Sequence, residues 1–284
     1  MDAVTWHDRP SLRRPVLLAA FEGWNDAADA ATTAARYLAS SWGTEVFATI
    51  DPEEFYDFTE VRPTVSLADD MTRHVEWPAP ELSFGHLAGA DRDVVMLLAP
   101  EPQLKWRTFC GAVVGVAMEL GCELAVSLGA LLNDTPHTRP TRVSGTAQGE
   151  AMAAVLGLTR SRYEGPTGIV GVLQEALSVV GIPSASLWAS VPHYVSRTPS
   201  PMAALALVER CATLLHATVD TAELAEAAEE YRQEVDDVVA ADPEAAAYVR
   251  GLESADHEPD LDEASADEIA VEAERFLREQ GRRD

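Results

Sequence analysis

Short apolar runs alternate with amphipathic segments along most of this chain. Residues 16–21 form a continuous apolar run directly after Arg14 and Pro15, which is typical of a strand buried on both faces of a sheet. Comparable runs predict further strands at residues 45–50, 94–99, 123–128 and 185–191. Helical periodicity predicts the helices between them, at residues 26–40, 108–120, 169–180 and 201–217.

The ends of these helices carry capping signals. Asn25 or Asp26 is expected to cap the first helix, Gly121 closes the second, and Pro201 stands in the first turn of the last. Strands that alternate with helices form βαβ units. The sequence therefore predicts an α/β fold, with a mainly parallel sheet and helices on both faces. Residues 51–87 contain short β-like pieces and many breakers, and we interpret them as an insertion.

The composition changes near residue 219. Residues 220–284 hold 22 acidic residues and 6 arginines, a net charge of −16. Spacings of four and three predict a helix with one apolar seam, made by Leu224, Ala228, Tyr231, Val235 and Val238. We therefore expect a core domain at residues 1–219 and an acidic helical C-terminal extension at residues 220–284.

The extension is expected to contain a second helix. Residues 254–264 are acidic, include a proline and are predicted to form a loop. Ser265 and Glu268 then have capping-box spacing, and an apolar face continues through Ile269, Ala273 and Phe276. Such a face needs a surface to cover it, which is either the core of the same chain or a neighbouring subunit.

The net charge restricts the classes of partner. The chain has 47 acidic and 21 basic residues, giving −26, so nucleic acid and anionic membranes are not expected partners. No apolar stretch approaches the length of a membrane span. Lys105 is the only lysine, and arginine and alanine dominate, which indicates the GC-rich coding typical of actinobacteria.

The cysteines indicate a reducing compartment. The chain has three cysteines, Cys110, Cys122 and Cys211, an odd number, and no two of them form a C-x-x-C pair. Neither a disulfide framework nor a zinc site is therefore expected. No secretory signal is expected, because polar residues such as Asp2 and Asp8 precede the first apolar run. These features predict a cytoplasmic protein.

The first candidate site follows the first predicted strand. The segment that links this strand to the next helix consists of Glu22, Gly23, Trp24, Asn25 and Asp26. It is expected at the carboxyl edge of the sheet, where open α/β folds bind ligands. Glu22 and Asp26 are candidates for an acid/base pair or a cation site. The structural alternative is that the glycine makes the turn, Asn25 or Asp26 caps the helix, and the tryptophan packs.

Two further candidates are Pro-His pairs at strand ends. Asp134 and His137 follow the strand at 123–128, and His193 and Tyr194 follow the strand at 185–191. These histidines are expected to converge at the same edge, either as bases or as structural hydrogen-bonding groups. Metal ligation is not predicted, because no H-x-x-x-H helix spacing occurs.

A glycine-rich segment precedes the helix at 169–180. Gly165, Gly168 and Gly171 could let backbone amides hold an anion. Their spacing matches neither the dinucleotide fingerprint nor the P-loop, and no lysine completes a P-loop. No Gly-x-Ser-x-Gly elbow is present. No cofactor is expected, and no catalytic residue can be assigned.

Four of these segments together resemble the proteasome-assembly-chaperone-2 family, as a bacterial, actinobacterial-type member. They are FEGWNDAADAAT at 21–32, SLGALLNDTPHTRP at 127–140, GPTGIVGVL at 165–173 and SLWASVPHYV at 186–195. The resemblance covers about residues 15–217. It implies an α/β core of the nucleoside-phosphorylase and peptidyl-tRNA-hydrolase type, self-association, and relatives that assist proteasome assembly or bind the proteasome core.

The chain departs from the family pattern at two places. The family commonly has glycine where Ala28 stands. Proteasome-docking relatives often end in hydrophobic–tyrosine–any residue, whereas this sequence ends with Gly281, Arg282, Arg283 and Asp284.

Two hypotheses of function follow. The first is a non-catalytic protein-binding scaffold that forms a homo-oligomer, with a trimer expected, and binds a proteasome-related or other protein. The alternative is a small-molecule enzyme, phosphorylase- or hydrolase-like, with a cleft at the carboxyl edge. A deep pocket joining Glu22, Asp26, His137 and His193 would favour the enzyme; an edge filled by those side chains would favour the scaffold.

Overall fold

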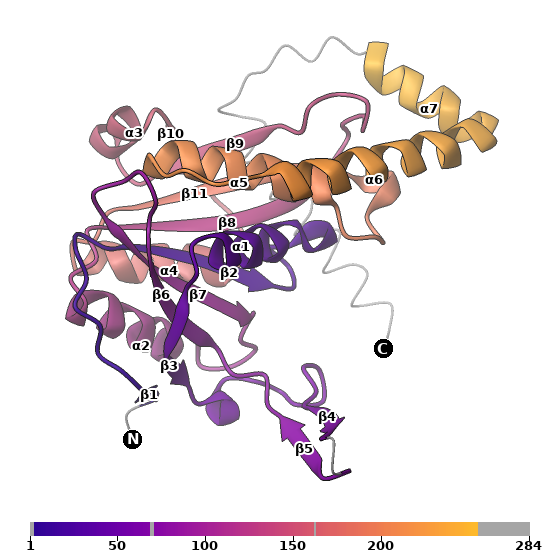
Figure 1. The fold of residues 1–284 in the computed structure, drawn as a ribbon. Coiled ribbons are helices and arrows are strands. Elements are labelled where there is room, and N and C mark those ends of the chain that lie inside the picture. Colours follow the sequence, from indigo (N-terminus) through magenta and orange to yellow (C-terminus); the bar gives the residue numbers. More distant parts are fainter. Residues whose placement is uncertain (1–2, 69–70, 162, 255–284) are drawn as a thin grey trace.

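A nine-stranded sheet forms the centre of the molecule (Figure 1). The computed structural model describes residues 3–68, 71–161 and 163–254. The strand order is β1-β3-β6-β7-β2-β8-β11-β9-β10. The strands are β1 (Val4–Trp6), β2 (Val16–Glu22), β3 (Glu45–Ile50), β6 (Glu81–His86), β7 (Asp93–Pro100), β8 (Leu124–Asn133), β9 (Val143–Ala147), β10 (Thr159–Arg160) and β11 (Ser184–Pro192).

The four central strands are parallel. β2 pairs with β7 on one side and β8 on the other, and β8 pairs with β11. Their continuous apolar sequences suit this position, because a central parallel strand is buried on both faces. The flanking strands β1, β3, β6 and β9 join antiparallel. The α/β class predicted from the sequence is confirmed.

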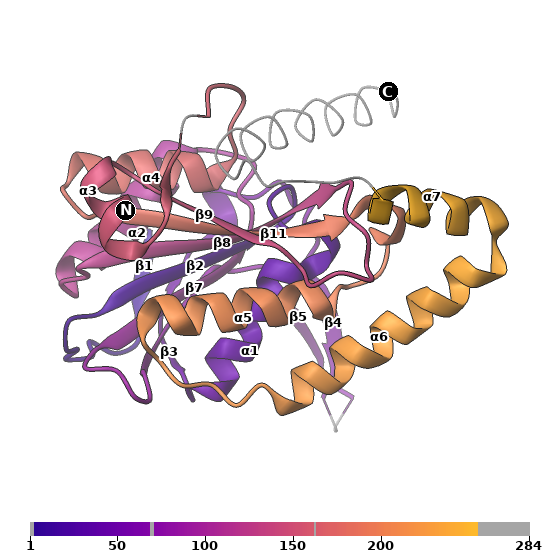
Figure 2. The same ribbon diagram turned by 90° about the horizontal axis from the view of Figure 1, so that it is seen from above.

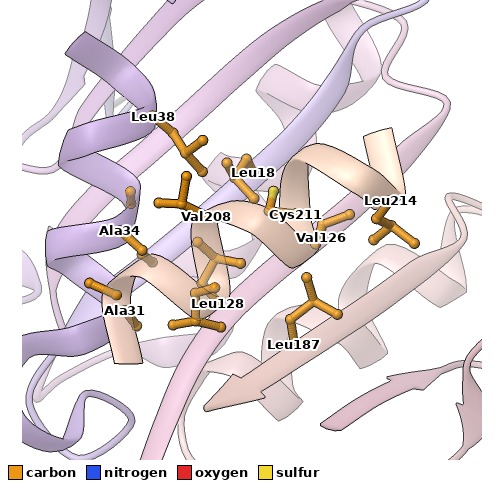
Figure 3. Close-up of a cluster of buried hydrophobic side chains, with 14 of the residues drawn as sticks. Leu18, Ala31, Ala34, Leu38, Val126, Leu128, Leu187, Val208, Cys211 and Leu214 are labelled. Carbon is orange, nitrogen blue, oxygen red and sulfur yellow. The ribbon is translucent and has the colours of Figure 1, made fainter. Parts of the chain in front are cut away.

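Two helices cover each face of the central strands. α1 (Ala30–Ser41) and α5 (Pro201–Leu215) pack on one face, and α2 (Trp106–Glu119) and α4 (Ile169–Val179) on the other. Alternate residues of β2 explain the division, since Leu18 faces the first pair and Leu17 the second. Figure 3 shows the first cluster, with Leu38 of α1 and Val208 of α5 meeting Leu18. A shorter helix, α3 (Glu150–Leu156), lies between β9 and β10.

The second cluster is rich in aromatic side chains. Phe109 of α2 makes edge contacts with Phe21 and Phe55, whose ring centroids lie 6.2 and 5.4 Å away. All three cysteines are buried and free. Burial raises the pKa of each thiol to about 12, so the three cysteines behave as small apolar side chains.

The C-terminal extension begins with two helices packed on the core. α6 (Ala222–Ala241) lies along α5, and α7 (Pro243–Ser254) turns back toward the ends of β8 and β11 (Figure 2). Four of the five predicted seam residues are buried; the fifth, Val238, is 69% exposed and Val239 is buried instead. The loop predicted beyond Ser254 and the helix predicted after Ser265 lie outside the described residues.

The segment interpreted as an insertion contributes both to the sheet and to a separate hairpin. β6 joins the main sheet, whereas β4 (Thr64–Leu67) and β5 (Arg73–Glu76) pair only with each other. Their ribbon projects from the body of the molecule (Figure 1). Within the described ranges, no helix is long and apolar enough to cross a membrane.

Candidate functional site

The carboxyl ends of β2, β7, β8 and β11 lie at one edge of the sheet, because these four strands are parallel. The polar segments that follow them therefore gather there.

Asp26 caps the start of α1. Its Oδ1 accepts hydrogen bonds from the backbone N–H of Ala31, at 2.6 Å, and of Thr32, at 3.2 Å, and its Oδ2 accepts one from the Thr32 hydroxyl. These bonds satisfy donors of the first helical turn, which have no partner within the helix. Burial is the main cause that raises the pKa of Asp26 to about 6. The capping alternative therefore describes its geometry, with one 3₁₀ turn (Ala27–Asp29) between the cap and α1.

Glu22 does not pair with Asp26. It ends β2 and forms an ion pair with Arg36 of α1, while its backbone carbonyl accepts the N–H of Glu101, at 3.0 Å. Both side chains of that ion pair are about half exposed, at 56% and 46%. The two carboxylates proposed as an acid/base pair thus have separate partners.

The predicted anion site at α4 is occupied by a carboxylate of the same chain. Glu101 Oε1 accepts the N–H of Ile169, the first residue of α4, at 2.9 Å. It also accepts from Asn25 Nδ2, at 3.3 Å. A carboxylate is favourable at this end of a helix. The pKa of Glu101 is raised overall, because desolvation by burial has a larger effect than these hydrogen bonds, which lower the pKa.

The glycines of this segment make room for neighbouring side chains. A Cβ on Gly168 would lie 2.7 Å from the Trp24 ring, and one on Gly171 would lie 2.0 Å from Thr167 Oγ1. A Cβ on Gly165 would lie 2.5 Å from the Tyr163 hydroxyl. Trp24 therefore packs over the start of α4, and this arrangement joins the β2 and β7 ends to that helix.

The Pro-His segments converge, as the sequence predicted. His137 follows β8, and its Nδ1 lies 2.7 Å from the hydroxyl of Tyr194, which follows β11. That hydroxyl also accepts the backbone N–H of His137, at 2.8 Å. On the opposite side, His137 Nε2 lies 3.0 Å from Asp236 Oδ1 on α6. A neutral ring that donates from Nε2 to Asp236 and accepts at Nδ1 from Tyr194 satisfies both contacts.

This network continues along α6. Arg232 donates to the other oxygen of Asp236, at 2.6 Å, and its guanidinium forms two bonds to Glu229. His137 is only 2% exposed, so α6 and the β8 loop cover it. Burial raises the pKa of Tyr194 to about 12, which keeps its hydroxyl protonated at neutral pH.

His193 lies in an aromatic group with Tyr194 and Tyr248. Its ring centroid lies 5.8 Å from that of Tyr194 and 5.5 Å from that of Tyr248 on α7, both edge-on. Its Nδ1 lies 3.0 Å from Asp134 Oδ1, outside hydrogen-bond geometry. Tyr248 donates to that same oxygen, at 3.3 Å. The second histidine segment thus holds α7, as the first holds α6.

The space beside His137 is small. A cavity of about 10 Å³ is lined by Thr135, Pro136, His137, Arg139, Thr141, Ser190, Pro192, Ser200, Met202 and Tyr231. That volume is about the least that admits one water molecule. Among the described residues, no three His, Cys, Asp or Glu side chains are placed to hold a metal ion. The polar side chains at this edge therefore bond to helices α1, α4, α6 and α7 and hold them against the sheet.

Three residues of this region were not identified from the sequence. Glu101 stands between two prolines directly after β7, and its position after a strand is the one signal that pointed to it. Asp236 and Tyr248 carry no such signal, because they lie on helices far along the chain and reach the edge only through tertiary packing.

Comparisons with known proteins agree on one family. The model of the PAC2 family matches residues 20–239 of the chain. A PAC2 family protein from Streptomyces avermitilis is 48% identical, with a TM-score of 0.76 over 83% of this chain and 99% of that one. A proteasome-assembly chaperone homologue from Mycobacterium tuberculosis is 47% identical, with a TM-score of 0.75 over 82% and 99%.

More distant structures share the fold. PbaB, an archaeal proteasome activator from Pyrococcus furiosus, is 17% identical, with a TM-score of 0.64 over 84% of this chain and 99% of that one. No curated protein matched the sequence. The family match extends beyond residue 217, past the four motif segments and the core helices, and includes most of α6.

Proposed function

This chain belongs to the PAC2 family, and from that premise we propose that it is a non-catalytic, chaperone-like scaffold that binds other proteins as a homo-oligomer. The observation that carries this proposal is the filled carboxyl edge. Asp26 caps α1, Glu101 occupies the start of α4, and His137 is bonded on both sides and covered by α6.

The nature of these bonds supports a structural role. An enzyme at this edge needs a concave space with polar groups directed into it. Asp26 and Glu101 instead direct their carboxylates at backbone N–H groups. Burial keeps the Tyr194 hydroxyl protonated, which makes it a poor nucleophile or base.

The proposed partner is a proteasome-related protein. The Mycobacterium tuberculosis relative, which is 47% identical, is described as a proteasome-assembly chaperone homologue. The net charge of −26 makes nucleic acid and anionic membranes poor partners. Three buried free thiols suit a reducing cytoplasm, and we place the protein there.

Light scattering on the full chain tests self-association. We expect one species of about three times 30.6 kDa at micromolar concentration, since a closed ring satisfies all of its interfaces. A mass of 30.6 kDa alone would contradict the homo-oligomer.

Co-purification tests the partner. The tagged full chain, purified from its native host at modest salt, is expected to bring down proteasome subunits that the tag alone does not.

An assay of nucleosides with inorganic phosphate tests the enzymatic alternative. Phosphorolysis or hydrolysis that survives repeated purification would contradict a non-catalytic scaffold.

A further inference from the structure

Large exposed apolar side chains gather on the β4–β5 hairpin. Among the described residues, five such side chains are at least half exposed within one segment of 13 positions: Val65 (50%), Leu67 (56%), Met71 (71%), Val75 (52%) and Trp77 (52%). Single exposed apolar side chains are ordinary, but a contiguous group of this kind marks an interaction surface.

The register of the hairpin places most of these side chains on one face. Val65 lies opposite Val75, and Leu67 lies opposite Arg73. Directly paired residues share a face, as do residues two apart along a strand. Trp77 continues the same alternation beyond β5. We call this face the apolar hairpin face; it consists of Val65, Leu67, Arg73, Val75 and Trp77.

The opposite face is polar. Thr64 lies opposite Glu76, and Ser66 lies opposite His74. The Ser66 hydroxyl donates to Glu76 Oε1, at 3.0 Å. The hairpin is therefore amphipathic, with one side suited to water and the other to a protein surface.

The hairpin lacks the support that a two-stranded sheet needs. β4 and β5 pair only with each other, and all eight of their residues are exposed. An isolated two-stranded ribbon is at best marginally stable in water. Its base is fixed by Trp77, whose ring meets Phe58 edge-on with centroids 4.8 Å apart, but this contact leaves the rest of the apolar hairpin face uncovered.

We propose that the apolar hairpin face is the surface through which one copy of this chain binds a second copy. This inference rests on the homo-oligomer proposed above and names its contact surface. The projection of the ribbon from the body (Figure 1) lets it reach a neighbouring copy without moving the core.

The charge distribution favours a second copy as the occupant. Two chains of charge −26 repel each other wherever carboxylates meet. The apolar hairpin face carries no carboxylate, and its one charged residue is Arg73, which has no ion-pair partner within the described residues. It can therefore approach the acidic surface of another copy, which offers carboxylates to that arginine. A basic partner would be drawn to the acidic helices instead.

Matched pairs of substitutions test this surface. Val65→Glu with Val75→Glu adds two negative charges to the apolar hairpin face, and Ser66→Glu with His74→Glu adds them to the polar face of the same ribbon. Light scattering over a dilution series is expected to show that the first pair dissociates at a concentration at least about 100-fold higher than the wild type. The second pair is expected to keep the wild-type mass.

Two further measurements secure the interpretation. Circular dichroism is expected to be unchanged in both variants, because the hairpin lies outside the main sheet, and thermal melting is expected to stay cooperative, with a lower midpoint only in the variant that dissociates. Acrylamide quenching of Trp77, obtained by difference from Trp77→Phe, is expected to rise when the wild-type oligomer is diluted.

Three outcomes would contradict the inference, and one of them would also contradict the homo-oligomer. If the wild type is an oligomer and both variants keep its mass, the hairpin inference is wrong and the proposed scaffold stands. If the first variant keeps its mass but loses proteasome subunits in co-purification, the face binds a foreign protein and the inference is again wrong. If the wild type has a mass of 30.6 kDa, the homo-oligomer and the inference both fail.

Discussion

At the scale of single residues, Asp26 links burial to pH. Its pKa is about 6 in the folded protein against an ordinary value of 3.8, chiefly because burial disfavours the charged form. Between these values the folded state holds a proton that the unfolded state has released. Stability from this group is therefore fully present below pH 3.8 and is lost as the pH rises through about 6.

Asp26→Asn is expected to remove this pH dependence. The unfolding free energy of the wild type, relative to the variant, should fall by about 2.4 kcal/mol between pH 4 and pH 7, since one pKa unit corresponds to about 1.4 kcal/mol and part of the change occurs below pH 4. Urea denaturation at several pH values measures it. A difference between the two proteins that stays constant with pH would contradict a raised pKa.

Asp26→Ala separates capping from charge. The asparagine retains an oxygen that can accept the N–H groups of Ala31 and Thr32, whereas the alanine does not. The alanine variant is expected to be about 1 kcal/mol less stable than the asparagine variant at every pH. Equal stability of the two variants would show that Asp26 does not act as a cap.

Ala28 adopts a backbone conformation that suits glycine. Its φ is 51°, in the left-handed region, where a Cβ costs about 1–2 kcal/mol. Ala28→Gly is expected to raise the unfolding free energy by about 0.5–1 kcal/mol, once the extra freedom of glycine in the unfolded chain is subtracted. The same substitution at Ala39, inside α1, should lower it by about 1 kcal/mol. A loss of stability at both positions would contradict the strain.

At the scale of elements, α6 shows where a sequence pattern stops being sufficient. The predicted seam used spacings of four and three, an average of 3.5 residues, and included Val238. A straight α-helix has 3.6 residues per turn and drifts about 20° per heptad from that repeat. After two heptads the buried position has therefore moved to Val239, while Val238 is 69% exposed.

Other elements show why some strands were predicted and others were not. β2, β7, β8 and β11 were predicted because central parallel strands are continuous apolar runs. β9 (Val143–Ala147) has small and polar residues and is mostly half-buried, so its sequence resembles a loop. It becomes a strand because its backbone pairs with β11. The local sequence of β9 gives no information about that pairing partner.

The attachment of α6 to the sheet edge can be tested at His137. His137→Ala removes the contacts to Tyr194 and Asp236, leaving those buried or half-buried groups without this partner. Hydrogen exchange is expected to become at least about tenfold faster in α6 and α7, with little change in β2. His74→Ala, on the exposed hairpin, is the control. Equal exchange in both variants would contradict this attachment.

At the scale of the whole molecule, the sequence predicted the layers of the fold but not which side chains of α6 and α7 contact the strand ends. The α/β class and the convergence of the two histidine segments follow from strand order and parallel geometry, which chain connectivity restricts. The partners of those segments, Asp236 and Tyr248, could not be predicted, because the path of α6 and α7 depends on which surface the core leaves uncovered.

The boundary at residue 219 remains a prediction, and truncation tests it. Of the extension's described residues, 220–254, the two large clusters of the core take only Leu224. Tyr231, Val235, Val239 and Val249 form a separate cluster with Tyr194 and Met202. The described part of the extension therefore packs mainly in its own cluster, and the two large clusters of the core stay nearly intact without it.

A chain of residues 1–219 is therefore expected to fold and to melt cooperatively, with a lower midpoint than the full chain. The extension carries −16 of the total charge of −26, so its removal should change which proteins co-purify, and this difference should shrink as salt rises. A chain of residues 1–254 is the control that keeps α6 and α7. The family match runs to residue 239. An insoluble or non-cooperative 1–219 product, beside a well-folded 1–254 product, would therefore show that α6 belongs to the folding unit of the core.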